Sequence, residues 1–188
     1  VVRTGGSSQI PCFIDLIAEH GTDLRWHTVI SNDRPRELEW IAAHPQVLIG
    51  FSDAGAHLRN MGFYNFPLHL LRMAHRAEQE GRPGMSPGRA VHRLTGELAD
   101  YLGVDAGHLR AGSRADVVVV DPNGLDGSLD ELHEEPMPGF SDLRRLVRRN
   151  DAAVRAVLVG GRLAWDGHEA APDLGKARGY GRLLRGSY

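Results

Sequence analysis

The stretch Val47-Leu48-Ile49-Gly50-Phe51-Ser52-Asp53-Ala54-Gly55-Ala56-His57 places an apolar run directly before a carboxylate, small residues and a histidine. A short apolar run of this kind predicts a strand buried on both faces, which is typical of parallel sheets covered by helices. In such sheets the functional residues lie at the carboxyl ends of the strands. We therefore expect Asp53 to carry chemistry, either as a metal ligand or in proton transfer. The alternative is that Asp53 only caps a turn.

The residues upstream of this stretch predict a βαβ unit. Leu24–Ser31 is rich in β-branched and aromatic residues and predicts a strand. A helix is expected from near Asp33, with Pro35 in its first turn, and it should end at His44-Pro45 because proline cannot continue the helical hydrogen bonds. Strand, helix and strand in this order predict a right-handed crossover between parallel strands. A further short helix is expected over residues 11–20.

Three more helices are expected after His57. The first runs from about Asn65 to Glu80, and the second begins at Ser86-Pro87, with serine as N-cap and proline at the first helical position. The third covers Thr95 to Leu102, and Gly103 supplies the left-handed residue expected just beyond a helix end.

The character of the sequence changes at Gly103, after which a small β unit is predicted. Ala115–Asp121 has the pattern of a strand, and the strands Val154–Val159 and Arg162–Trp165 flank Gly160-Gly161, which predicts a two-residue hairpin turn. We therefore predict two domains, residues 1–103 and 104–188.

Two segments of the second domain are expected to lie on the surface. Asn123 to Gly139 is rich in Asp, Glu, Pro and Gly and predicts a long loop. Arg144-Arg145 and Arg148-Arg149 have helical spacing and predict a solvent-exposed helix face.

Composition excludes several classes of protein. Of 188 residues, 41% are hydrophobic and 24% charged, which is a globular balance, and the net charge of −2 gives no basic footprint for nucleic acid. No stretch is apolar over a membrane-spanning length, so no membrane partner is expected. The single cysteine, Cys12, cannot form an internal disulfide; it predicts an inert buried thiol and favours a cytoplasmic location.

Ser52–His57 followed by Leu94–Gly103 resembles the amidohydrolase superfamily. Gly107–Pro122 resembles the return of that family from its barrel to its small β domain, and Val154–Gly167 resembles its closing hairpin. The Ser-Asp-Ala-Gly-Ala-His form, together with Gly181–Gly186, is most similar to the branch of D-aminoacylases, which are N-acyl-D-amino-acid deacylases.

This resemblance implies an α/β fold that combines the C-terminal part of a metal-dependent (β/α)8 barrel with part of a small β-sandwich domain. Residues 1–103 would be the last βα units of the barrel, and residues 104–188 the C-terminal part of the small β domain with its surface loop and tail. The family holds one or two divalent metals, usually zinc. The aspartate after its eighth strand is both metal ligand and general acid/base, and by resemblance this residue is Asp53.

Two neighbours of Asp53 are candidate substrate-binding residues. His57 could hydrogen-bond a substrate carboxylate or carbonyl, and the alternative is a loop-packing role. Ser52 could orient Asp53 through its hydroxyl, and the alternative is a hydroxyl satisfied by backbone.

The metal site expected from the resemblance is incomplete in this chain. A zinc site needs three or four protein ligands, and no two of the ten histidines are separated by a single residue, so the His-x-His pair of the family is absent. We therefore expect the chain to be the C-terminal third or so of a longer enzyme, inactive alone and unable to hold zinc alone.

The expected function is hydrolysis of a carbon–nitrogen bond other than a peptide bond, in a small N-acyl amino acid or related amide, by metal-activated water. A second possibility is a cyclic-amide hydrolase of the hydantoinase or dihydropyrimidinase kind. A third is a non-catalytic barrel relative that serves binding or assembly. The sequence leaves the oligomeric state open.

Overall fold

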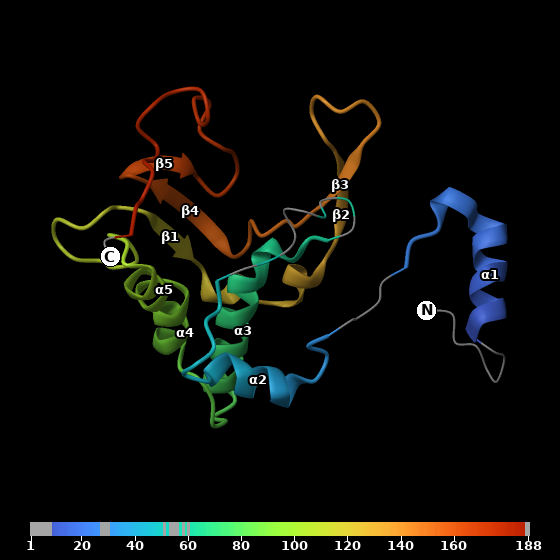
Figure 1. Cartoon of the computed structure of the whole chain (residues 1–188), viewed down its shortest axis with the longest axis horizontal. Coiled ribbons are helices and arrows are strands. Elements are labelled where there is room, and N and C mark those ends of the chain that lie inside the picture. The colour runs from blue at the N-terminus through green and yellow to red at the C-terminus, as the bar shows by residue number, and fades with distance from the viewer. Residues whose placement is uncertain are drawn as a thin grey trace. The chain divides into compact units, whose positions relative to one another are not determined.

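The computed structural model describes residues 9–26, 31–50, 52, 57, 59 and 61–186 (Figure 1). The chain divides into two units, Val1–Leu38 and Glu39–Tyr188, and the boundary falls within helix α2 (Pro35–Ala43). The first unit contains α1 (Gln9–His20) and the 3₁₀ turn η1 (Gly21–Asp23). Within it the rings of Phe13 and Trp26 meet edge to face, with 5.4 Å between their centroids.

The five helices predicted from the sequence are confirmed. Besides α1 and α2 they are α3 (Phe66–Gln79), α4 (Pro87–Leu94) and α5 (Gly96–Leu102). The Ser86 hydroxyl accepts a hydrogen bond from the Arg89 amide at 3.2 Å, which satisfies one of the free N–H groups at the start of α4. Gly103 ends α5 with φ of 62°, a conformation that glycine adopts without steric cost.

The predicted three-stranded unit is also confirmed. It contains β1 (Val117–Val120), β4 (Val154–Val159) and β5 (Arg162–Trp165), in the antiparallel order β1-β4-β5. Gly160 and Gly161 join β4 to β5 with φ of 59° and 80°, as a two-residue turn with both central residues left-handed requires.

The predictions for residues 123–149 are wrong in part. The 3₁₀ turns η4 (Pro122–Gly124) and η5 (Gly127–Asp130) and strand β2 (His133–Pro136) replace the expected loop, and β3 (Arg144–Val147) replaces the expected helix. β2 and β3 form a separate antiparallel hairpin. The arginine side chains contact the facing strand, because Arg144 donates to the Glu134 carbonyl at 2.6 Å and Arg149 to the Glu135 carboxylate at 2.7 Å.

The two strands expected for the barrel do not form in the described residues. Val47–Gly50 has no regular secondary structure, and neither do residues 24–26 at the start of the other expected strand. A strand in a parallel sheet needs a hydrogen-bonded neighbour. The Val47 carbonyl instead accepts a hydrogen bond from the side chain of Arg93 on α4. The barrel itself stays a prediction.

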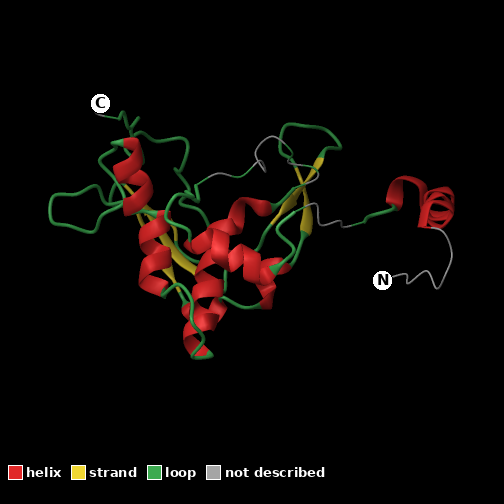
Figure 2. Ribbon diagram, turned by 60° about the horizontal axis from the view of Figure 1, so that its bottom comes forward, coloured by secondary structure: helices red, strands yellow, loops and turns green. Residues whose placement is uncertain are grey.

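Two apolar clusters hold the second unit together. One joins Ala42, Leu70, Ala74 and Ala90, from α2, α3 and α4, with Ile49 packed against it. The other joins Leu68 of α3 to three residues beyond Gly103, namely Leu125, Leu129 and Ala153. Figures 1 and 2 both show α3 between the three-stranded sheet and the β2–β3 hairpin. The domain division at residue 103 stays a prediction.

Among the described residues, none of the helices combines the length and the apolar character that crossing a membrane requires.

Candidate functional site

The candidate site is the segment 47–65, which contains all three residues singled out in the sequence. Asp53 lies outside the described residues. Ser52 is half-buried, and His57 is exposed. The carbonyl of His57 accepts a hydrogen bond from the amide of Met61 at 2.8 Å. Contacts with surrounding elements hold the two ends of segment 47–65.

Arg93 of α4 holds the upstream end of segment 47–65. Its guanidinium donates to the Val47 carbonyl, and its side chain is only 1% exposed. The Nη1 atom of Arg93 also lies 3.6 Å from the carboxylate of Glu97, which is four residues further along the chain on α5. Burying a guanidinium is costly unless it is paired. The hydrogen bond from Arg93 to the Val47 carbonyl attaches α4 to the upstream end of segment 47–65.

Glu97 bridges two arginines of different exposure. It accepts a hydrogen bond at 3.1 Å from Arg89, which is 41% exposed, and it faces the buried Arg93. Three side-chain atoms of this group are buried without a hydrogen-bond partner among the described residues: Nε and Nη1 of Arg93, and Oε2 of Glu97. The pair therefore depends on mutual charge attraction more than on complete hydrogen bonding.

Close packing also positions the approach to Ser52. Ile49 packs into the helical cluster, and a Cβ at Gly50 would lie 3.1 Å from two methyl carbons of Leu98 on α5. A side chain larger than glycine's would require the leucine to move by a few tenths of an ångström. Ile49 and Gly50 thus lie close against this group of helices.

Arg148 holds the downstream end of segment 47–65. Its Nε donates to the Gly62 carbonyl at 2.8 Å, and its Nη1 donates to the carbonyls of Leu129 at 3.2 Å and Glu131 at 3.0 Å. Its backbone amide donates to the Tyr64 hydroxyl. Burial lowers the pKa of Arg148 below its ordinary value, although an arginine stays protonated at neutral pH.

Asn65 completes the downstream attachment. This buried side chain donates from Nδ2 to the Leu129 carbonyl at 3.0 Å and to Oδ1 of Asn150 at 3.3 Å. Asn65 directly precedes α3, so these bonds link the start of the helix to the turns before and after the β2–β3 hairpin. A buried amide with two such partners fixes the local backbone.

A charged cluster lies on the next turn of α3. Arg72 donates two hydrogen bonds to the Asp130 carboxylate, at 2.8 and 2.9 Å, and its Nη2 lies 3.0 Å from Nδ1 of His69. Burial, and then the charge of Arg72, lower the pKa of His69 below its ordinary value. The hydrogen bond from Arg72 lowers the pKa of Asp130, so this carboxyl stays ionised near neutral pH.

The described residues do not by themselves form a zinc site. No group of three or more His, Cys, Asp or Glu side chains in the part of the chain that the structure describes is close enough to hold a metal ion. Cys12 is a half-buried free thiol in the first unit. Asp53, which lies outside the described residues, stays a candidate ligand by resemblance.

Comparison with known proteins gives relatives but no family. Three mycobacterial proteins, one from Mycobacterium bovis and two from strains of Mycobacterium tuberculosis, are each 49% identical to the chain over 182 residues, and each is described as uncharacterized. The match covers 96% of the chain and 29% of each relative, so the chain spans less than a third of the length of these proteins. No family model and no solved structure matches the chain.

Proposed function

We propose that the chain is the C-terminal part of a metal-dependent hydrolase that cleaves carbon–nitrogen bonds other than peptide bonds, with N-acyl-D-amino acids as the substrate class. The observation that carries the proposal is the order of four motifs, Ser52–His57, Leu94–Gly103, Gly107–Pro122 and Val154–Gly167, which is the order found in amidohydrolases.

Features of the structure support this proposal. After segment 47–65 the chain forms α3, α4 and α5, then β1, the β2–β3 hairpin and the β4–β5 hairpin, and β1 and β4–β5 lie where the resemblance expects strands. Arg93 and Arg148 attach the two ends of segment 47–65 to surrounding elements. Holding a functional segment at both ends on packed elements favours a defined site, which supports the proposal.

Asp53 is the proposed general acid/base and a metal ligand. As general base, its carboxylate takes a proton from the attacking water, and it then returns the proton to the amine that leaves. His57 is exposed and is proposed to donate a hydrogen bond to the substrate carboxylate or carbonyl; Ser52 is proposed to orient Asp53. One or two divalent ions, with zinc as the proposed metal, would lower the pKa of the attacking water.

The other metal ligands are proposed to lie in segments of a longer protein. The chain spans 29% of the length of its relatives, which leaves ample sequence for them. The 188 residues alone are accordingly proposed to be inactive.

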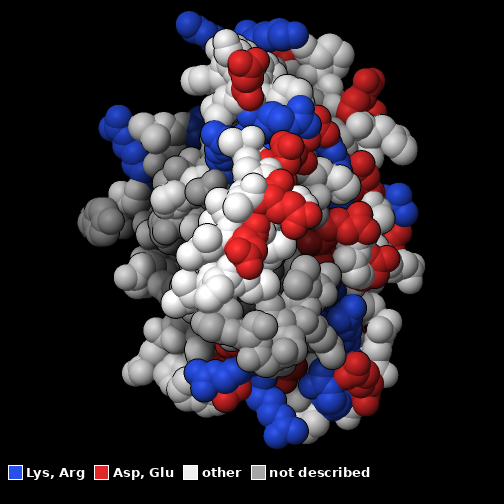
Figure 3. All heavy atoms as spheres, turned by 90° about the vertical axis from the view of Figure 1, so that its right-hand side faces the viewer, with Lys and Arg blue, Asp and Glu red and all other residues white. Residues whose placement is uncertain are grey.

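The proposed partner is a small molecule in the cytoplasm. The net charge is −2, and the face shown in Figure 3 carries both acidic and basic side chains. Nucleic-acid binding uses a continuous basic surface, so this distribution favours a small substrate. The lone Cys12 suits a reducing compartment.

The test is an assay of the complete gene product with N-acetyl-D-amino acids, their L-enantiomers and cyclic amides. We expect hydrolysis of the D-compounds, and Asp53→Asn should lower kcat/KM by at least about a hundredfold because it removes the proton-transfer group. Asp151→Asn is the matched control, since Asp151 is exposed and distant in sequence from the site; it should retain full activity.

Full turnover by Asp53→Asn would remove this residue from the mechanism. Hydrolysis of cyclic amides in place of N-acyl-D-amino acids would keep the reaction class and change the substrate. No hydrolysis of any of these compounds by a folded, metal-loaded protein would contradict the proposal and favour a binding role.

A further inference from the structure

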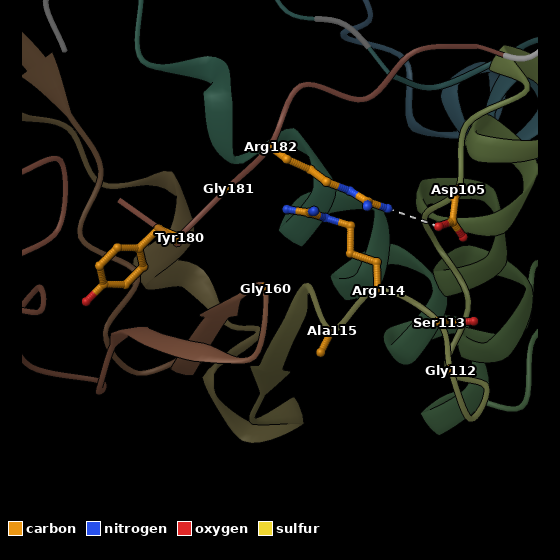
Figure 4. Close-up of a pocket in the computed structure, with 10 residues that line it drawn as sticks. Asp105, Gly112, Ser113, Arg114, Ala115, Gly160, Tyr180, Gly181 and Arg182 are labelled. Carbon is orange, nitrogen blue, oxygen red and sulfur yellow. Dashed lines mark hydrogen bonds and ion pairs between the residues drawn. The ribbon is translucent and has the colours of Figure 1, made fainter. Parts of the chain in front are cut away.

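A cavity of about 510 Å³ lies in the second unit, where three segments far apart in sequence meet. These are the loop between α5 and β1, the turn between β4 and β5, and the C-terminal segment. Figure 4 shows the residues that line the cavity, among them Asp105, Arg114, Gly160, Tyr180 and Arg182. The proposed hydrolytic function uses none of them. The volume is that of a typical small-molecule site.

Hydrogen bonds to fixed partners hold the walls of this cavity. The Asp116 carboxylate accepts hydrogen bonds from the Gly160 amide, at 2.7 Å, and from Nε of Arg114. Tyr180 is buried, and its hydroxyl donates to Asp173. The guanidinium of Arg162 lies 4.3 Å from the centre of the Tyr180 ring. These interactions hold part of the rim of an open surface pocket.

Arg114 is a fixed donor with unused hydrogen-bonding capacity. Its side chain is only 10% exposed, and Asp116 holds its Nε. Neither terminal nitrogen of Arg114 has a hydrogen-bond partner within the described ranges. The planar fork of a guanidinium matches the two oxygens of a carboxylate or phosphate.

Arg182 is a second donor, and its partner can be replaced. Both Arg114 and Arg182 line the pocket, and in Figure 4 the Arg182 side chain extends toward Asp105 while that of Arg114 extends in the opposite direction. Arg182 bonds Asp105 at 3.2 Å, and both side chains of this pair are more than half exposed. Exposed ion pairs of this kind are weak, so an oxyanion that also contacts Arg114 can displace Asp105.

We propose that this cavity binds a small organic anion through its carboxylate or phosphate group, with Arg114 as the fixed donor and Arg182 as a donor released from Asp105. In the absence of ligand, Asp105 and Asp116 balance the two arginine charges. On binding, the oxyanion of the ligand replaces Asp105 as the partner of Arg182. The site therefore binds an anion although its own charges are balanced.

The test is calorimetric titration of the purified protein with inorganic phosphate and, separately, with acetate, at constant ionic strength. We expect saturable binding of one equivalent of at least one probe, and the preferred probe identifies the headgroup. Arg114→Gln should weaken binding by about tenfold or more, since a charge-assisted bidentate contact is lost. Asp105→Asn should strengthen binding by about threefold, because the competing carboxylate is removed.

Arg110→Gln is the matched control, because Arg110 is an exposed arginine of the same loop that does not line the cavity. It should bind like the wild type. The absence of saturable binding at millimolar concentrations would overturn the proposal, and so would equal losses in Arg110→Gln and Arg114→Gln. Circular dichroism checks the fold of each variant. If Arg114→Gln does not fold, the test depends on Asp105→Asn, and an affinity equal to that of the wild type in this variant would overturn the proposal. Binding is measured without turnover, so the result is independent of the proposed hydrolase.

Discussion

Arg93 is predicted to contribute strongly to stability. It is almost fully buried and donates to the Val47 carbonyl, while Glu97 faces it. Arg93→Met keeps the apolar stem and removes the charge, which leaves Glu97 and the carbonyl without this partner. We expect a loss of about 3 kcal/mol in the free energy of unfolding, measured by urea denaturation.

Arg89→Met is the control for this prediction, because Arg89 bonds the same carboxylate from an exposed position. It should cost about 1 kcal/mol or less. Equal losses in the two variants would show that burial of Arg93 does not stabilise the approach to the candidate site.

His69 should make stability depend on pH. Burial and Arg72 lower its pKa in the folded protein; Arg148 acts in the same direction, while Asp130 opposes it. The unfolded chain therefore binds the proton first as pH falls through about 6.5, and stability decreases until folded His69 is protonated as well.

We expect His69→Gln to lose less thermal stability than the wild type between about pH 7 and about pH 5, because glutamine does not titrate. Melting temperatures measured at several pH values in this range test the difference. The prediction fails if both proteins lose the same amount.

At this scale the sequence predicts only part of the site. The apolar run before Asp53 and the family resemblance single out this carboxylate. They do not predict Arg93 or Arg148, since arginine is seldom buried and its burial depends on a distant carbonyl that no local pattern predicts. Arg93 lies 46 residues from Val47, and Arg148 lies 86 residues from Gly62.

Among the elements, the 3₁₀ turn η4 offers a direct test of packing. A Cβ at Gly124 would lie 2.1 Å from the carbonyl oxygen of Ala152, a distance that no side chain can adopt without moving the backbone. Gly124→Ala should therefore lower the free energy of unfolding by about 3 kcal/mol, measured by denaturant titration.

Gly127 provides the comparison, because a Cβ there would meet no heavy atom within 4 Å and its φ is not left-handed. Gly127→Ala should change stability by only about 0.5 kcal/mol. A similar loss in both variants would contradict the close contact between η4 and residue 152.

Local signals explain which elements could be predicted. Ser86-Pro87, Gly103 and Gly160-Gly161 fix helix ends and a turn within a few residues, and all three predictions hold. The sequence of the β2–β3 hairpin shows no alternation of apolar and polar residues. Arg–Glu pairs across the strands stabilise this hairpin in part, and a hydrophobic pattern does not reveal such pairs. Its arginines mimic the spacing of a helix face.

At the scale of the whole molecule, the expected strand at Val47–Gly50 shows the limit of local patterns. The predicted burial on both faces is wrong in part, since Ile49 is partly buried and packs against the helical cluster while Leu48 is exposed. Strand formation depends in addition on partners elsewhere in a sheet, which a local sequence cannot specify. The barrel and the domain division at residue 103 therefore stay predictions.

Metal content, measured by mass spectrometry after dialysis, tests the central claim most directly: that Asp53 belongs to a hydrolytic metal site shared with other segments of a longer protein. We predict one or two equivalents of zinc in the complete gene product and none in the 188-residue chain. Zinc retained one-to-one by the chain alone, or a folded complete gene product that binds no divalent metal, would contradict the claim.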